Sequence, residues 1–135
     1  MVTRRNENVA TAEDAELVLK LYELRREPVL RQAREWFMRE FNPQSQEEMQ
    51  KLCPPGSDAN RFYRMVTTYW EMAAACMVHG GIDEALFLET SGECMVVWRK
   101  VAGWIGDVRA ARHQPGYLRN VEEVAKRMEA YRSRG

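Results

Sequence analysis

Residues 58–81 read DANRFYRMVTTYWEMAAACMVHGG, and this stretch decides the fold class. Its apolar side chains recur every three or four residues, the spacing that places them on one face of an α-helix. Asp58 is suited to cap the first turn, and Gly80–Gly81 offers the left-handed residue that commonly ends a helix. The pattern predicts a helix from Asp58 to about His79 whose buried face is made of Phe62, Met65, Val66, Tyr69, Met72, Ala73 and Cys76.

The next stretch, residues 82–112, continues the helical spacing. Asp83 is suited to cap a helix that begins at Glu84. A single helix from there to Arg112 has a small-residue stripe, where another helix could approach closely. We therefore predict a long central helix over about 84–112, and a break near Ser91–Gly92 is the alternative. Its two faces are an apolar one (Phe87, Cys94, Val97, Val101, Ile105, Val108) and a small one (Ala85, Gly92, Gly103, Gly106, Ala110).

Upstream, Pro28 separates two further helical segments. Thr11 is suited to cap a helix over residues 12–26, and the apolar spacing resumes over residues 29–41. Because proline lacks an amide hydrogen and crowds the preceding turn, the pattern predicts a kinked N-terminal helix, and it equally allows two helices end to end. Ser45 and Glu48 have the spacing of a capping box, which predicts a short helix over residues 46–52.

The C-terminal segment predicts one more amphipathic helix. Pro115 suits a first turn, and the apolar positions that follow are Tyr117, Leu118, Val121, Val124, Ala125 and Met128. Residues 1–10 and 132–135 are polar and unpatterned, so we expect a disordered N-terminus and a loose C-terminal tail. No strand pattern occurs. The sequence thus predicts an all-α, single-domain helical bundle of four to six helices over residues 11–131.

Composition narrows the class of protein. The 135 residues are 45% hydrophobic and 30% charged, which is typical of one globular domain. Twenty basic and twenty acidic side chains give no net charge, so we expect neither a nucleic-acid nor a membrane partner. The three cysteines show no CxxC spacing, and the chain has no signal peptide and no long apolar run. These features predict a cytoplasmic protein.

Motifs that carry chemistry are missing from the sequence. Neither His79 nor His113 follows a glutamate by three residues, as a di-iron carboxylate bundle requires. Cys76 and His79 share a helical face and could share Zn²⁺, but a core cysteine beside a helix-end histidine is the simpler interpretation. No base is implied near Cys53, and no Gly-x-Ser-x-Gly elbow occurs. We therefore predict no catalytic, cofactor-binding or metal-binding residue and favour a protein that is not an enzyme.

The second half of the chain resembles a known family. The pattern is Trp70-Glu71, a run of small and apolar residues, Gly81-Ile82-Asp83, then Trp98, Arg109, Arg112 and Tyr117. Over residues 68–128 this is similar to short bacterial helical proteins catalogued only as a domain of unknown function. The resemblance implies an all-helical fold, and it does not supply an activity.

Charges at unusual places suggest one structural contact. Glu71 lies beside Trp70 in an otherwise apolar helix, and Arg99 lies on the small-residue stripe. A buried carboxylate must be paired, and a guanidinium pairs it as a fork. We predict a buried or half-buried ion pair between Glu71 and Arg99, Arg109 or Arg112 that fixes the helix register. The functional alternative is a small-ligand or anion-binding bundle that uses Trp70, Glu71, Trp98 and one of these arginines.

The length of the predicted central helix indicates self-association. A helix over 84–112 would span about 43 Å at 1.5 Å per residue, more than the diameter of a compact chain of this size. The projecting part would expose apolar side chains that a two-fold contact could cover. We therefore predict a self-association or protein-interaction module that forms a homodimer, with a candidate interface made of Val101, Trp104, Ile105 and Val108.

Overall fold

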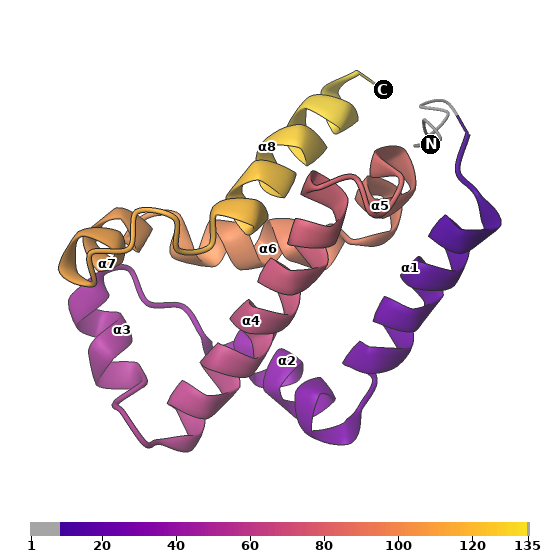
Figure 1. Cartoon of the computed structure of the whole chain (residues 1–135). Coiled ribbons are helices and arrows are strands. Elements are labelled where there is room, and N and C mark those ends of the chain that lie inside the picture. The colour runs from indigo at the N-terminus through magenta and orange to yellow at the C-terminus, as the bar shows by residue number, and fades with distance from the viewer. Residues whose placement is uncertain (1–8, 135) are drawn as a thin grey trace.

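The structure is a computed structural model that describes residues 9–134, and within them it contains eight helices and no strand (Figure 1). The predicted all-α class is confirmed, whereas the predicted count of four to six helices is too low. The helices are α1 Ala12–Arg25, α2 Pro28–Glu40, α3 Gln46–Leu52, α4 Asp58–Val78, α5 Glu84–Thr90, α6 Gly92–Val101, α7 Ile105–Ala111 and α8 Arg119–Ser133.

Helix α4 runs through the middle of the fold and packs against α2, α6 and α8 (Figure 1). Its N-cap is Ser57, whose hydroxyl accepts from the amide of Asn60 at 3.1 Å, so the predicted cap at Asp58 is off by one residue. The predicted buried face is also turned, because Met72 and Cys76 are exposed. The residues that α4 buries are Tyr63, Val66, Thr67, Tyr69, Trp70, Ala73, Ala74 and Met77.

The predicted long helix over 84–112 is in fact three helices, α5, α6 and α7. One break falls at Ser91, the alternative considered from the sequence, and the other falls between Val101 and Ile105. At the second break the Trp104 indole N–H donates to the Pro43 carbonyl at 3.1 Å, which fixes the broken segment to the loop before α3. Of the glycines in the predicted small-residue stripe, Gly103 and Gly106 face open space, whereas Gly92 lies next to the side chain of Arg132 in α8.

The residues predicted as a dimer interface belong to the core of the monomer. Val101, Trp104, Ile105 and Val108 are 0%, 2%, 3% and 4% exposed. Because the long helix is broken, its two ends fold back onto the domain instead of projecting from it. Trp104 packs near the rings of Phe41 and Tyr63, with centroids 6.1 and 6.4 Å away. The predicted interface is therefore wrong, and so is the geometric argument that led to it.

The N-terminal part consists of two helices rather than one kinked helix. Pro28 occupies the first turn of α2, where its missing amide hydrogen costs nothing, and the Glu27 carboxylate accepts from the Leu30 amide at 2.8 Å. At the start of α1, Thr11 and Asp14 form a reciprocal capping box. The buried Asp14 carboxylate also accepts from the Asp83 amide at 2.9 Å, so one side chain holds the beginnings of both α1 and α5.

The predicted termini fall partly outside the described part of the chain. Residues 1–8 of the predicted disordered N-terminus are among the residues that the structure does not describe, as is Gly135. Residues 132 and 133, predicted to begin a loose tail, are helical and belong to α8.

Candidate functional site

Trp70, predicted as a ligand-binding residue, lies in the core. Its side chain is 0% exposed, and its indole N–H donates to a Glu93 carboxylate oxygen at 2.7 Å. The ring of Tyr69 stands edge-on to it at 5.0 Å, and the Arg25 guanidinium lies 5.3 Å from its centroid. No part of Trp70 is therefore available to a ligand.

A carboxylate–guanidinium fork does occur, but between residues that the sequence analysis did not single out. Arg34 of α2 donates from two nitrogens to the two oxygens of Glu93 of α6, at 2.8 and 2.9 Å. Its third nitrogen donates to the Arg25 carbonyl at 3.0 Å. The hydrogen bonds to Glu93 raise the pKa of Arg34 above its ordinary value. This fork joins α2 to α6, and through Trp70 it also joins both to α4.

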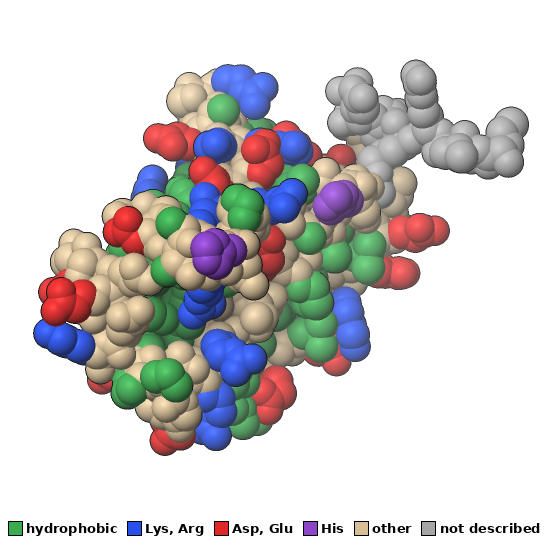
Figure 2. All heavy atoms as spheres, turned by 60° about the vertical axis from the view of Figure 1, so that its left-hand side comes forward, with side chains coloured by type: hydrophobic (Ala, Val, Ile, Leu, Met, Phe, Trp, Pro, Cys, Tyr) green, Lys and Arg blue, Asp and Glu red, His purple; other side chains and the backbone are tan. Residues whose placement is uncertain are grey.

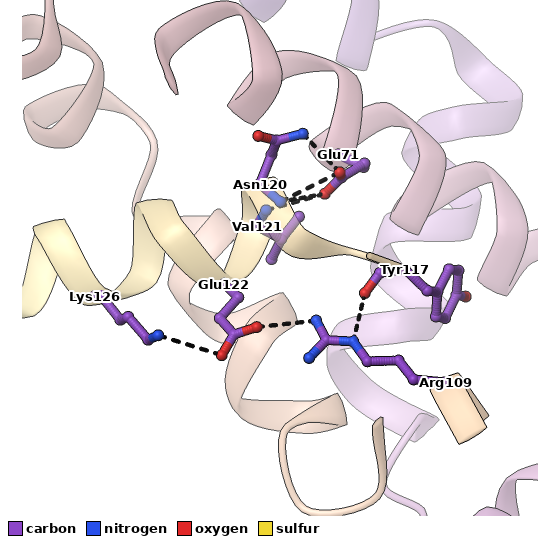
Figure 3. Close-up of polar contacts among 7 residues, drawn as sticks. All are labelled: Glu71, Arg109, Tyr117, Asn120, Val121, Glu122 and Lys126. Carbon is purple, nitrogen blue, oxygen red and sulfur yellow. Dashed lines mark hydrogen bonds and ion pairs between the residues drawn. The ribbon is translucent and has the colours of Figure 1, made fainter. Parts of the chain in front are cut away.

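Glu71 caps α8 instead of pairing with an arginine (Figure 3). Its carboxylate accepts from the backbone amide of Asn120 at 3.1 Å, from that of Val121 at 3.0 Å and from the Asn120 side-chain amide at 2.9 Å. The N-cap of α8 is Leu118, a left-handed residue whose side chain cannot accept a hydrogen bond. Glu71 thus supplies the missing cap from another helix, and the predicted Glu71–arginine pair is wrong in its partner.

The three arginines predicted as partners have separate roles. Arg109 donates to the Tyr117 carbonyl and to the Glu122 carboxylate, both at 2.9 Å, and so holds the segment between α7 and α8 in place (Figure 3). The Arg109 guanidinium also lies 5.8 Å from the ring of Trp98, a half-buried residue. Arg99 is exposed on another side of α6. Arg112 is exposed, and its guanidinium lies 5.3 Å from the ring of Tyr117.

A groove of about 770 Å³ lies between α4 and the segment that joins α7 to α8. Figure 2, in which that side of the molecule comes forward, shows basic side chains next to apolar ones around a hollowed part of the surface. Two predicted residues, Glu71 and Arg112, line this groove, while Trp70, Trp98, Arg99 and Arg109 do not. Its other walls include Tyr63, Arg64, Thr68, Met72, Tyr117 and Leu118.

Two tyrosines close one end of the groove. The hydroxyl oxygens of Tyr63 and Tyr117 lie 2.8 Å apart, so one hydroxyl donates to the other. Burial, and the neighbouring Tyr117, raise the pKa of Tyr63 far above its ordinary value, so its hydroxyl keeps its proton at any physiological pH. Tyr63 is therefore a neutral hydrogen-bonding group and cannot supply a phenolate for catalysis.

The groove was hard to foresee because its residues look like core residues in the sequence. Met72 fits the apolar spacing of α4, yet its side chain is 48% exposed and forms part of the groove wall. The signal that was available is Thr68, a polar residue in the middle of an apolar helix, which the structure exposes. Its neighbour Thr67 gives no such signal, because it is buried and its hydroxyl donates to the Tyr63 carbonyl.

Taken together, these features define an all-α, single-domain protein with one well-lined surface groove. Within residues 9–134 there is no group of three or more side chains that could hold a metal ion, and no helix has both the length and the apolar character needed to cross a bilayer. The chain belongs to a family described as a domain of unknown function (DUF4760), whose model matches residues 10–128. No curated protein and no solved structure matches the chain.

The family match confirms the resemblance seen in the sequence and extends it. The resemblance rested on residues 68–128, whereas the match begins at residue 10 and therefore includes α1, α2 and α3. It also includes all residues that line the groove.

Proposed function

We propose that this protein is a non-enzymatic binding module that takes a small molecule in the groove between α4 and the α7–α8 segment. The groove itself supports this proposal, because its volume of about 770 Å³ lies within the range of small-molecule sites. Its walls are mainly apolar, with a few polar groups converging on the same space, which is the usual composition of such sites. Met72 and Leu118 supply apolar surface, and Arg64 and Arg112 supply charge.

A neutral apolar dye tests whether the groove binds ligands at all. We expect N-phenyl-1-naphthylamine to gain fluorescence when it is added to the wild-type protein. Ala75→Trp should abolish most of this gain, because Ala75 lines the groove and an indole ring would fill it. The measurement is a fluorescence titration at constant protein concentration.

The matched control places the same substitution outside the groove. Ala130 is exposed on α8 and does not line the groove, so Ala130→Trp should leave the dye titration unchanged. Equal dye binding by Ala75→Trp and wild type would place the dye elsewhere and contradict the proposed function.

Self-association is a second candidate function, and a different surface favours it. Helix α1 carries four large apolar side chains that are well exposed: Leu17 44%, Leu19 65%, Tyr22 48% and Leu24 42%. Only Asp14 and Leu21 of this helix are buried. Leu19 and Tyr22, three residues apart, share one side of the helix, and Leu17 and Leu24, seven residues apart, share another. Exposed apolar side chains that lie next to each other are typical of a contact site. A homodimer would therefore form through α1 and not through the residues of α6 and α7.

Sedimentation velocity across the micromolar range tests this second candidate. We expect a concentration-dependent species heavier than the 15.8 kDa monomer, and we expect Leu19→Glu to remove it. Leu52→Glu, the same change at an exposed leucine of α3, is the control and should leave the sedimentation unchanged. A single 15.8 kDa species at every concentration would exclude a homodimer.

A further inference from the structure

Most polar groups along the groove already have partners within the protein. The hydroxyls of Thr67 and Thr68 donate to the carbonyls of Tyr63 and Arg64, at 2.8 and 2.6 Å. The Asn60 side-chain amide donates to the Cys53 carbonyl at 3.2 Å. A ligand in the groove would gain little by competing with these short intrachain hydrogen bonds.

Two arginine side chains along the groove differ from these groups, because they lack such partners among the described residues. Within residues 9–134, the guanidinium groups of Arg64 and Arg112 form neither a hydrogen bond nor an ion pair, and that of Arg112 lies 5.3 Å from the ring of Tyr117. Each guanidinium has five N–H donors in a planar fork that fits a carboxylate or a phosphate. In the Tyr63–Tyr117 pair one hydroxyl hydrogen is used between the two rings, which leaves the other to donate to a ligand.

The single acid along the groove does not oppose an anion strongly. Glu71 accepts hydrogen bonds from two backbone amides and one side-chain amide at the N-terminus of α8, where the helix dipole is positive. Its negative charge is therefore offset locally. Arg64 lies seven residues before Glu71 on α4, about 10 Å along the helix axis. An anionic group held by the arginines would thus lie away from this carboxylate.

We infer that the ligand of the groove is an anionic amphiphile, with its charged head on Arg64 and Arg112 and its apolar body along Met72, Ala75 and Leu118. This inference rests on the proposed function, and it adds the chemical class of the ligand. The unpartnered donors along the groove are two cationic guanidinium groups and one neutral hydroxyl. They favour a ligand with a negatively charged head that accepts hydrogen bonds. The remaining walls are apolar, which selects for a hydrocarbon body.

Displacement of the neutral dye by matched eight-carbon compounds tests the inference. Octanoate and octyl phosphate carry an anionic head, and 1-octanol has the same chain length without the charge. We expect both anions to displace the dye at concentrations at least about tenfold lower than octanol, because a hydrogen bond between two charged groups is stronger than one to a neutral hydroxyl. Comparing octanoate with octyl phosphate shows whether the head is a carboxylate or a phosphate.

The double variant Arg64→Gln/Arg112→Gln identifies the cause of the preference. Both side chains are exposed, so the variant should fold. Once its own affinity for the dye has been measured, we expect anions and octanol to displace the dye from it equally. Arg61→Gln is the control and should keep the preference, because Arg61 lies outside the groove and pairs with Asp58 at 3.3 Å.

The outcomes separate the inference from the proposed function. If octanol displaces the dye as well as octanoate does from the wild-type protein, the groove is a binding site without a preference for anions, and only the inference fails. If the preference persists in the double variant, the arginines are not its cause and the inference fails too. If the dye does not bind, or Ala75→Trp does not affect it, the proposed function fails first.

Discussion

Trp70→Ala is expected to lower the free energy of unfolding by about 3–5 kcal/mol, the cost of deleting a large buried aromatic side chain. The indole is 0% exposed and is packed against Tyr69, so its removal leaves a large cavity. It also removes the N–H that donates to Glu93, a carboxylate that Arg34 already binds. Urea unfolding followed by far-ultraviolet circular dichroism measures the change.

Trp70→Phe separates the contribution of the buried aromatic ring from that of the hydrogen bond to Glu93. Phenylalanine keeps an aromatic ring in the core but cannot donate to Glu93. We therefore expect a loss of about 1–3 kcal/mol, the cost of the smaller ring together with that of leaving a half-buried acceptor short of one partner. Equal losses for Trp70→Phe and Trp70→Ala would show that the hydrogen bond dominates. A loss below about 1 kcal/mol for Trp70→Ala would contradict the expected contribution of this side chain to the stability of the core.

Glu71→Ala is expected to lower the free energy of unfolding by about 2–4 kcal/mol, because it removes several hydrogen bonds to a charged acceptor at one helix end. Helix α8 has no side-chain cap of its own, so nothing replaces Glu71. The amides of Asn120 and Val121 would lose their acceptor. We also expect the first turn of α8 to fray, which hydrogen exchange at these two amides would detect.

Two further variants make the Glu71 experiment specific. Glu71→Gln keeps an acceptor without the negative charge and should cost about half as much as alanine, since neutral hydrogen bonds are roughly half as strong as charge-assisted ones. Glu129→Ala, at an exposed position of α8, should change stability by less than about 0.5 kcal/mol. Unchanged exchange at Asn120 and Val121 in Glu71→Ala would show that another group caps α8.

The sequence predicted the helices that local signals define. The cap at Ser45 and the boundary at Gly80–Gly81 both mark helix ends that the structure contains. The predicted capping box is only half formed, because the Glu48 carboxylate accepts from the Gln44 amide and not from that of Ser45. The break between Val101 and Ile105 has a weak local signal, Gly103, because glycine disfavours a helix interior, but the apolar spacing continues through it. The hydrogen bond from Trp104 to the Pro43 carbonyl at this break joins residues 61 positions apart, and no periodicity reveals it.

The candidate site was predicted only in part, again because its contacts join residues that are far apart in the sequence. Glu71 stood out because a carboxylate in an apolar helix needs partners, and that reasoning was sound. Its partners proved to be backbone amides of α8, and backbone groups carry no residue-specific signal in a sequence. The Arg34–Glu93 fork went unnoticed because both residues look like ordinary charged positions on exposed helix faces. Only the packing of α2 against its neighbours brings them together.

The carboxylate of Asp14 sets an order of events during protein synthesis. Helix α1 leaves the ribosome early, but the Asp83 amide that its buried carboxylate binds is made 69 residues later. At about 5–20 residues per second, that delay is about 3 to 14 s. The hydroxyl of Tyr69, which donates to the Leu21 carbonyl, is made earlier, so α1 can contact α4 before it contacts α5. The link between the beginnings of α1 and α5 can therefore form only in the last part of synthesis or after it.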